Sequence, residues 1–540
     1  MAKEQTKTIY QSLWNSADIL RSKMDASEYK NYTLGLIFYK YLSDNMLHHV
    51  AELLEKQVDD LKEAQEVYTE AFNDPEIKSD LIDELKFDFS YVIEPELTFT
   101  ALMQSIYKGQ FQLEDLAQAF RNIEQSSEIF EDLFEDIDLY SKKLGASVQK
   151  QNQTISAVMK ELATLDMAHQ GDVLGDAYEY LIGEFASDSG KKAGEFYTPQ
   201  PVSTLMTQIV LHGKKDKKGF TVYDPTMGSG SLLLNVQKYT NEPGTVNYFG
   251  QELNTSTYNL ARMNMFLHKV DVSNQHLHNA DTLDADWPTE EPTNFDGVLM
   301  NPPYSAKWSG EKGFLDDPRF SMYGVLAPKS KADFAFLLHG YYHLKDSGVM
   351  AIVLPHGVLF RGGAEGKIRK ALLENGAIDT VIGLPANIFF NTSIPTTVII
   401  LKKNRESKDV LFIDASNEFT KAKNQNILEE KHIEKILETY AKRENVDKYA
   451  QVASYDDIIE NDYNLNIPRY VDTFEEEEPI SLAEVAKELK ETRAKIEESN
   501  IALAEMAQEL TASTEESQKE LDAFMELLGF NKNFGGEHHE

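Results

Sequence analysis

The stretch that most constrains the fold runs from Phe295 to Tyr304, with the sequence Phe-Asp-Gly-Val-Leu-Met-Asn-Pro-Pro-Tyr. Its four apolar or small residues, Gly297 to Met300, predict a short buried strand. The two prolines must end this strand, because neither has an N–H to donate to a neighbouring strand. The strand therefore delivers Asn301 at its carboxyl end, and in an open α/β sheet ligands bind at that edge.

The polar groups at this strand end favour one kind of ligand. The two prolines fix φ and hold the carbonyl and the side-chain amide of Asn301 in one direction, and Tyr304 adds a flat ring with a polar tip. A rigid amide, a carbonyl and an aromatic ring suit a planar heterocycle that carries an exocyclic amine. The alternative is a strand that simply ends in a Pro-Pro turn.

A second predicted strand, Thr221 to Asp224, is followed by a glycine-rich turn and a helix. Gly228 and Gly230 allow the backbone to adopt positive φ and to approach a ligand closely, and the first turn of the helix offers free N–H groups. Two nucleotide-binding motifs fit poorly here. A P-loop requires a lysine directly after its last glycine, where this chain has Ser231, and a dinucleotide fingerprint requires a third glycine, where it has Leu233.

Both segments resemble motifs of the DNA methyltransferases that methylate amino groups. The catalytic motif of that family is Asn or Asp-Pro-Pro-Tyr or Phe, and residues 301–304 match it. Its S-adenosylmethionine motif is Asp-Pro-x-x-Gly-x-Gly-x-Leu-Leu, and residues 224–233 match that pattern. The resemblance implies S-adenosyl-L-methionine as the cofactor and a catalytic group that consists of Asn301, Pro302, Pro303 and Tyr304.

The resemblance also implies a reaction. The side-chain oxygen of Asn301 and the carbonyl of Pro302 would accept the two hydrogens of the target amine, while Tyr304 stacks on the base. Because the amine of a paired base lies inside the duplex stack, the base must be flipped out. Asn rather than Ser at position 301 favours N6 of adenine over N4 of cytosine.

Three further segments match family patterns for cofactor contact. The strand predicted at 246–250 is followed by Glu252, which would bind ribose hydroxyls, although a solvated glutamate at a strand end fits equally. Asp281 stands in the family's small-then-Asp pattern for the adenine amine. Residues 193–202 resemble the Gly-x-Phe-Tyr-Thr-Pro segment that holds the methionine half of the cofactor, although Thr198 could instead cap the helix that follows. The cofactor-binding residues that the resemblance implies are Glu195, Phe196, Tyr197, Thr198, Pro199, Gln200, Pro201, Val202, Ser203, Asp224, Thr226, Gly228, Ser229, Gly230, Ser231, Leu232, Glu252 and Asp281.

Two segments near the catalytic motif are candidates for contact with DNA. The loop 305–331 is locally basic in an acidic chain, which suits an extruded nucleotide or its phosphates, and a plain surface loop fits as well. Phe389 and Phe390 precede a predicted strand, and the corresponding segment of the family helps to hold the flipped base. We expect one of the two rings in the core and the other at the base pocket.

The middle of the chain alternates strands with helices, which predicts a mostly parallel, doubly wound α/β sheet. The resemblance adds that this is a Rossmann-like S-adenosylmethionine-dependent methyltransferase sheet of seven strands with one reversed, which spacing alone does not show. No metal site is expected. Strands are expected near 220–223, 246–250, 297–300, 348–354, 378–384, 396–402 and 410–413, and helices at 254–267, 331–344, 364–375 and 427–443.

The remaining sequence predicts helical parts on either side of the sheet. Residues 1–165 contain few glycines and several helical stripes, and they resemble the N-terminal helical domain of the modification (methyltransferase) subunit of type I restriction-modification systems. The aromatic-rich helix Tyr29 to Tyr41 is expected to be core, without a chemical role. The predicted domains are residues 1–165, a methyltransferase domain at 166–405, its extension at 406–474, and a helical, coiled-coil-like tail at 475–540 that binds a partner.

The composition argues against a chain that binds DNA without a partner protein. Lysines and arginines number 53 against 89 acidic residues, a formal net charge of -36. Duplex binding depends on cationic side chains that neutralise phosphates, so another protein is expected to supply much of the positive surface. The sequence has no cysteine, no apolar signal segment and no long apolar run, which predicts a cytoplasmic protein without a membrane partner.

These features predict a modification subunit that acts within a type I complex. The chain shows no extended variable domain for reading bases and no Walker A motif for a translocase. Its expected partners are DNA, a specificity subunit, a restriction subunit and a second copy of this chain, with two copies for each specificity subunit. Two alternatives stay open: an S-adenosylmethionine-binding scaffold without catalysis, and a protein-glutamine methyltransferase, which shares Asn-Pro-Pro-Tyr but fits the length, the helical N-terminal domain and the tail less well.

Overall fold

The computed structural model describes residues 2–168, 172–188, 197–389, 392–422, 425–473 and 481–527. The chain forms two compact units, Met1–Thr473 and Phe474–Glu540. Three of the predicted site residues, Glu195, Phe196 and Phe390, lie outside the described residues, as does the acidic stretch that precedes the tail.

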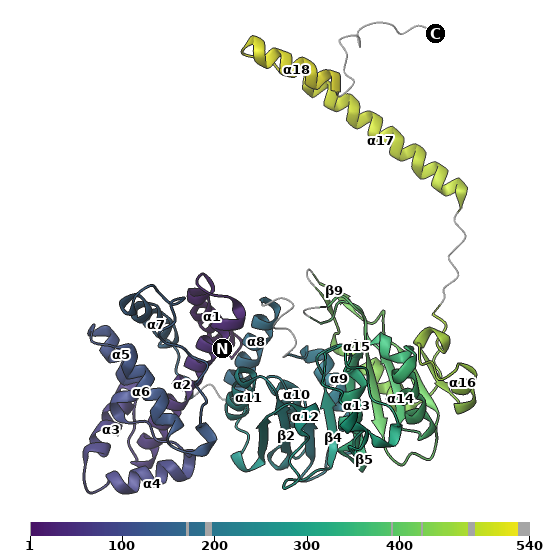
Figure 1. Cartoon of the computed structure of the whole chain (residues 1–540). Helices are drawn as coiled ribbons and strands as arrows, with labels where there is room; N and C mark the ends of the chain where they lie inside the picture. The colour runs from purple at the N-terminus through teal and green to yellow at the C-terminus, as the bar shows by residue number, and fades with distance from the viewer. Residues whose placement is uncertain are drawn as a thin grey trace, which may run out of the picture. The chain divides into compact units, whose positions relative to one another are not determined.

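The amino-terminal part of the first unit is helical, as predicted (Figure 1). Polar residues at helix starts explain several boundaries, because the side chains of Asp60, Thr98 and Ser147 each accept a hydrogen bond from a backbone N–H in the following turn. The helices are α1 (Ala2–Arg21), α2 (Ala26–Leu53), α3 (Leu61–Asn73), α4 (Lys78–Phe89), α5 (Phe99–Tyr107), α6 (Leu113–Glu124), α7 (Val148–Leu162) and α8 (Asp172–Asp188), with short 3-10 turns at Pro95–Leu97 and Glu128–Phe130.

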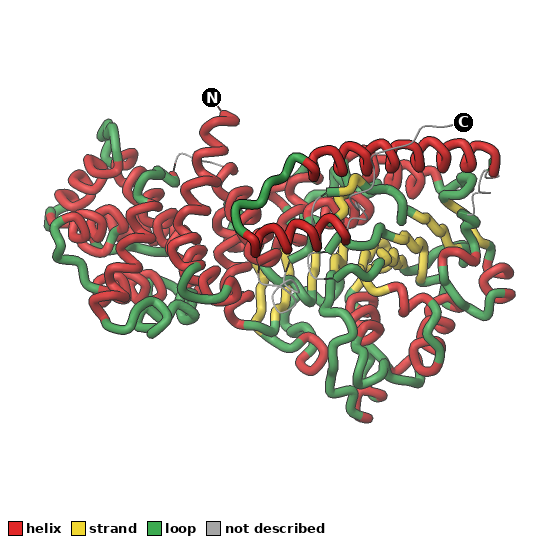
Figure 2. The backbone as a smooth tube through the Cα atoms, turned by 90° about the horizontal axis from the view of Figure 1, so that it is seen from above, coloured by secondary structure: helices red, strands yellow, loops and turns green. Residues whose placement is uncertain are grey.

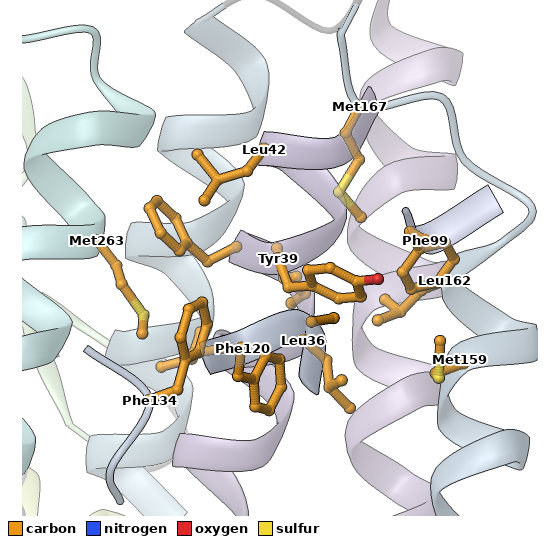
Figure 3. Packing of buried hydrophobic residues seen from close by; sticks show 14 of the residues in the cluster. Leu36, Tyr39, Leu42, Phe99, Phe120, Phe134, Met159, Leu162, Met167 and Met263 are labelled. Atoms are coloured by element: carbon orange, nitrogen blue, oxygen red, sulfur yellow. The ribbon is translucent and has the colours of Figure 1, made fainter. Parts of the chain in front are cut away.

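Helix α2 is the centre of this helical domain. Most of its residues are buried, and the ring of Tyr39 lies 5.8 Å from that of Phe99 and 5.7 Å from that of Phe120. Figure 3 shows this core, in which Met263 of α11 (Thr255–Leu267) takes part. Because α11 also packs on β2 and β3, this helix links the core of the helical domain to the sheet.

The rest of the first unit is built on a mixed sheet with the strand order β11-β8-β6-β7-β5-β4-β1-β2-β3. From β6 to β3 the strands are parallel except β7, which is antiparallel to both β5 and β6. This confirms the α/β class and the reversed strand. The strands are β1 (Thr221–Asp224), β2 (Asn247–Glu252), β3 (Gln275–Asn279), β4 (Phe295–Met300), β5 (Leu344–Pro355), β6 (Ile378–Gly383), β7 (Thr396–Lys402), β8 (Val410–Asp414) and β11 (Ala450–Ala453), and β9 (Thr420–Lys421) pairs with β10 (Asn426–Ile427) in a separate small sheet.

The sheet has nine strands among the described residues, so the expectation of seven is wrong in number. Strand β8 pairs in parallel with β6, and β11 pairs antiparallel with β8, which extends the sheet beyond β6. Strand β3 is also absent from the strands expected, because Gln-His-Leu-His-Asn gives no apolar run that a sequence pattern could show.

Alternation along the strands separates two apolar cores. On β1, Val222 packs in the core covered by α9, α10 and α15, whereas Tyr223 packs in the core covered by α13 and α14. On β4, Leu299 packs in the same core as Val222, and Met300 packs in the same core as Tyr223. Helices therefore cover both faces of the sheet, as Figure 2 shows. These helices are α9 (Gln200–Val210), α10 (Ser231–Tyr239), α12 (Thr282–Ala285), α13 (Asp333–Tyr342), α14 (Gly363–Glu374), α15 (Glu430–Lys442) and α16 (Tyr455–Glu460).

The second unit contains the two predicted long helices, α17 (Leu482–Gln508) and α18 (Glu515–Leu527). Apolar side chains along α17 are exposed, among them Leu482, Leu489 and Ile496. In the part of the chain that the structure describes, no helix is both long and apolar enough to cross a membrane.

Candidate active site

Two cavities lie at the carboxyl edge of the sheet, and Asn301 lines both of them. The larger has a volume of about 640 Å³ and the smaller about 10 Å³. Asn301 directly follows β4, and Thr226, which follows β1, also lines both cavities. The strand end and the glycine-rich turn that the sequence singled out therefore meet around one side chain.

The smaller cavity is bounded by the glycine-rich turn and by the segment before α9. Gly228 and Gly230 have φ angles of 56° and 76°, and Gly230 directly precedes α10. Because this left-handed region disfavours residues with a side chain, the two glycines fix the shape of the turn. The other residues that line this cavity are Tyr197, Thr198, Asp224, Met227, Ser229, Ser231 and Leu232.

The side-chain amide of Asn301 is held from two sides. Its Nδ2 donates to Oγ1 of Thr198 at 3.1 Å, and its Oδ1 accepts from the hydroxyl of Tyr304 at 2.9 Å. Thr198 does not cap α9, because Pro199 occupies the N-cap position. The threonine hydroxyl orients Asn301 instead.

Tyr304 packs through its ring and donates through its hydroxyl. The ring meets that of Phe389 edge to face, with centroids 6.0 Å apart, and Phe389 itself is buried. Burial raises the pKa of Tyr304 well above its usual range, so the hydroxyl keeps its proton and its role as a donor. Phe389 therefore lies beside the Asn-Pro-Pro-Tyr motif.

Asp224, the last residue of β1, is a buried carboxyl group beside the smaller cavity. It is 1% exposed and accepts from the backbone N–H and the hydroxyl of Thr226, at 2.9 and 3.3 Å. Burial raises its pKa to about 8 against these two hydrogen bonds, and the charge of Glu252 adds to the rise. A cation that entered this cavity would favour the ionised form of Asp224.

Glu252 and Asp281 line the larger cavity from the ends of two neighbouring strands. Glu252 ends β2, and its carboxylate accepts from the N–H groups of Gly228 at 3.1 Å and Asn254 at 2.8 Å. Burial raises its pKa. Asp281 accepts from N–H groups in the first turn of α12 and so caps that helix. Both carboxyl groups can accept hydrogen bonds from hydroxyls or amines in the cavity.

The structure does not bring every predicted residue to the two cavities. Gln200 and Ser203 hydrogen-bond Asn235 at 2.9 and 3.0 Å, which ties α9 to α10, and Val202 packs in the apolar core. The predicted residues among those described that line neither cavity are Pro199, Gln200, Pro201, Val202, Ser203, Gly230, Pro302, Tyr304 and Phe389.

One wall of the larger cavity comes from residues that sequence reasoning missed. Ser27, Lys30 and Asn31 of α2 line it, together with Phe336 of α13. The helical domain therefore contributes to the site, although the pattern of its central helix predicts only core. The signal in the sequence is a lysine between two tyrosines, Tyr29 and Tyr32, in a helix predicted to be core.

A doubly wound sheet in which β7 is reversed between parallel strands, with an Asn-Pro-Pro-Tyr motif at its carboxyl edge, fits an amino-methylating methyltransferase. Comparison with known proteins agrees, because residues 169–479 match the family described as N-6 DNA Methylase and residues 9–162 match the HsdM N-terminal domain. The chain belongs to the family of type I restriction enzyme methylase subunits, and it is an adenine-specific DNA methyltransferase.

The likeness to individual relatives extends over nearly the whole chain. The type I restriction enzyme MpnII methylase subunit of Mycoplasma pneumoniae is 36% identical over 529 residues, which covers 92% of this chain and 96% of the relative. The MjaIX methylase subunit of Methanocaldococcus jannaschii is 28% identical, with coverage of 91% and 89%. A crystal structure of a type I restriction-modification methyltransferase subunit from Streptococcus thermophilus is 72% identical and covers 87% of this chain and 100% of that one, with a TM-score of 0.85.

Proposed function

We propose that this chain transfers a methyl group from S-adenosyl-L-methionine to N6 of an adenine that is flipped out of duplex DNA. The observation that carries the proposal is the place of Asn301, which lines both cavities at the carboxyl edge of the sheet. A side chain at that junction can hold an amine while it stays close to a methyl donor bound next to it.

The residues around the cavities fit the chemistry of the cofactor. A volume of about 640 Å³ lies within the usual range of small-molecule sites. Glu252 and Asp281 supply acceptors for hydroxyls and for an amine, and Asp224 supplies a carboxyl group for the cationic methionine portion. Bound cofactor would supply an electrophilic methyl group on a sulfonium.

Asn301 is suited to receive the target amine. Its Oδ1 accepts from Tyr304, and an amide oxygen has a second lone pair that can accept from the amine. The carbonyl of Pro302 would accept the other hydrogen, and the two contacts would draw the nitrogen lone pair out of ring conjugation for in-line attack. Tyr304 would stack on the base, with Phe389 at the edge of its pocket.

The negative charge of the chain supports the proposal that a partner protein recognises the target sequence in the DNA. A net charge of -36 disfavours binding to DNA phosphates by this chain alone, and Arg319, in the loop after the catalytic motif, is 2% exposed and engaged by Asp317 and by backbone carbonyls. A specificity subunit would read the DNA in the cytoplasm and dock on the tail, with two copies of this chain per specificity subunit, and a restriction subunit would complete the complex. Residues 1–165, 166–405, 406–474 and 475–540 would be its helical, catalytic, extension and partner-binding domains.

The proposal is tested by incubating the purified chain with labelled cofactor and duplex DNA, with and without the specificity subunit. Labelled N6-methyladenine is expected only in the paired sample. Asn301→Ala in the same pair is the matched control and should give no label. Label on protein rather than DNA would overturn the proposal.

The proposed role of the C-terminal helices in binding the specificity subunit has a separate test. A chain that ends at Pro479 should bind cofactor as the full chain does and fail to assemble with the specificity subunit, because it lacks α17 and α18. Assembly by the truncated chain, or tight site-specific DNA binding by the isolated full chain, would contradict the role given to the partner.

A further inference from the structure

The helical domain places a charged side chain in the wall of the larger cavity. Lys30 lies in the second turn of α2 and is 6% exposed, with Ser27 and Asn31 beside it in the same wall. A lysine is seldom buried to this extent unless its charge meets a partner. The sheet contributes Glu252 to the same cavity.

The groups around Lys30 and Glu252 are mainly acidic. Asp136, from the segment between α6 and α7, and Glu252 both attract the Lys30 charge, whereas burial lowers the pKa of Lys30 to about 8. Burial raises the pKa of Glu252; hydrogen bonds from the backbone N–H groups of Asn254 and Gly228 oppose that rise, and the charge of Lys30 adds to their effect. Asp224 on β1 interacts unfavourably with Glu252, and Asp281 lines the same cavity. Lys30 is thus a cation among several carboxyl groups.

A packed interface sets the position of Lys30 relative to Glu252. Asn259 of α11 donates to the carbonyl of Asp132 at 2.9 Å and to Oδ2 of Asp136 at 3.4 Å. The apolar core that α2 and α11 share adds to this contact. Because α11 closely follows β2, the interface holds the strand end that carries Glu252 against the helical domain.

We propose that Lys30 is a positioning residue of the cofactor site: its ammonium, buried in the wall of the same cavity, attracts the Glu252 carboxylate, so that docking of the helical domain prepares the group that binds the ribose hydroxyls. The inference rests on the proposed function, because it assumes that the cofactor occupies the larger cavity. An ionised carboxylate accepts at both oxygens, whereas a protonated one gives up part of that capacity. Cofactor affinity then depends on a residue of the other domain.

The role of Lys30 has a pH signature. Without the charge of Lys30, burial raises the pKa of Glu252 further, so cofactor affinity begins to fall at a higher pH when the solution is acidified. Above about pH 8 the native lysine gives up its own proton, and the difference between the native chain and an uncharged variant disappears. A purely structural role would give a loss of affinity that does not change with pH.

The test is calorimetric titration of the full-length chain with S-adenosyl-L-methionine between about pH 6 and about pH 9. Affinities are compared as ratios of variant to native, which cancels the titration of the cofactor itself. Lys30→Met should be weaker by about tenfold near the acid end and equal to the native chain near the alkaline end. Lys30→Arg, which stays protonated, should follow the native chain at the acid end.

A matched control removes the same charge elsewhere. Lys23 is an exposed lysine just before α2 that does not line the cavity, so Lys23→Met should equal the native chain at every pH. In a Glu252→Gln background, where position 252 cannot ionise, Lys30→Met should lose its pH-dependent effect. Lys30→Gln repeats the comparison with a polar side chain, and thermal melting checks that each variant is folded.

The outcomes separate this inference from the proposed function. A ratio for Lys30→Met that is the same at every pH, or an affinity unchanged near pH 6, would overturn the role of Lys30 and leave the methyltransferase proposal standing. If the native chain does not bind the cofactor at all, both fail together.

Discussion

Two buried aspartates on adjacent parallel strands, Asp296 and Asp224, show how the two edges of the sheet differ. Each is 1% exposed. Asp296, near the start of β4, accepts from the ammonium groups of Lys217 and, at 3.0 Å, of Lys345. Burial acts to raise its pKa, but these hydrogen bonds hold the pKa of Asp296 below its usual range.

Asp224, at the end of β1, meets no such cation among the residues that the structure describes. Its hydrogen bonds come from Thr226, and burial raises its pKa to about 8. At the amino edge the buried carboxylate is therefore neutralised by two lysines, whereas at the carboxyl edge the buried carboxyl group has no counter-charge among the described residues. A buried carboxyl group that lacks a counter-charge marks the functional edge of this sheet better than burial alone does.

The largest effect is expected at the carboxyl edge, from Asn301→Ala. Loss of the amide removes an acceptor for the target amine, and methyl transfer should fall by about a thousandfold, as when a transition-state hydrogen bond is deleted. Cofactor affinity should stay within about threefold, because the amide contacts the base rather than the cofactor. Single-turnover transfer and calorimetry measure the two quantities, and a near-native rate would remove Asn301 from its role.

The opposite pattern is expected at the amino edge, from Asp296→Ala. Removing this carboxylate frees two partly exposed lysines and leaves the backbone N–H and the hydroxyl of Thr221 without their acceptor, so the free energy of unfolding should fall by about 2 kcal/mol. Urea denaturation measures the change, and cofactor affinity should not move. Asp346→Ala, which removes an exposed carboxylate early in β5, is the control and should stay within about 0.5 kcal/mol of the native chain. If Asp296→Ala lost cofactor affinity without losing stability, the two edges of the sheet would not differ in the way described.

The residues of the carboxyl edge could be predicted because strand ends are visible in the sequence. A Pro-Pro pair fixes where β4 stops and so places Asn301, and the strand predicted at 246–250 places Glu252 at its carboxyl end. The glycines at 228 and 230 are explained by the positive φ that the structure shows. Local chemistry was enough for these residues, because each is positioned by its own strand or turn.

Lys30 and two strands could not be predicted, for different physical reasons. Lys30 lies near the start of a helix whose aromatic and apolar residues predict a place in the core, while its position at the cavity depends on the docking of two domains. Strand β3 has alternating polar residues, and Ala450–Ala453 is too short to give a pattern. The order of the strands follows from long-range pairing, which the family resemblance supplied and spacing did not.

A smaller effect is expected from Asp224→Asn, which keeps the shape of the side chain and removes its ability to ionise. Cofactor affinity should fall by at least about tenfold, because a cation–carboxylate contact becomes a contact with a neutral amide. Calorimetry measures the loss, and Asp296→Ala is the matched comparison at the other edge. Equal losses of affinity in the two variants would mean that Asp224 has no special role at the site.

The same variant should show a pH-dependent gain in stability. Because the folded-state pKa of Asp224, about 8, lies above the ordinary value of 3.8, protonation favours the folded state. That contribution is complete below the ordinary value and is lost as the pH rises through about 8. Asp224→Asn should therefore match the native melting temperature in acid and exceed it increasingly towards pH 8. A constant difference would contradict the assignment of the pKa.

The smallest effect is expected from Tyr304→Phe. The hydroxyl accounts for one of the two contacts on the Asn301 amide, and Thr198 keeps the other. The phenylalanine ring still packs against Phe389, so the transfer rate should fall only about threefold, in line with the loss of one hydrogen bond whose acceptor can find another donor. Thr198→Val alone should behave similarly.

The double variant Tyr304→Phe with Thr198→Val decides between orientation and simple packing. If the two contacts orient the amide, each single variant leaves one of them in place, and removing both should cost more than the product of the two single effects. Independent packing roles would give effects that multiply. A more-than-multiplicative loss of transfer rate, at unchanged cofactor affinity and melting temperature, would show that the carboxyl edge depends on the direction of one amide, whereas the amino edge depends on the neutralisation of one charge.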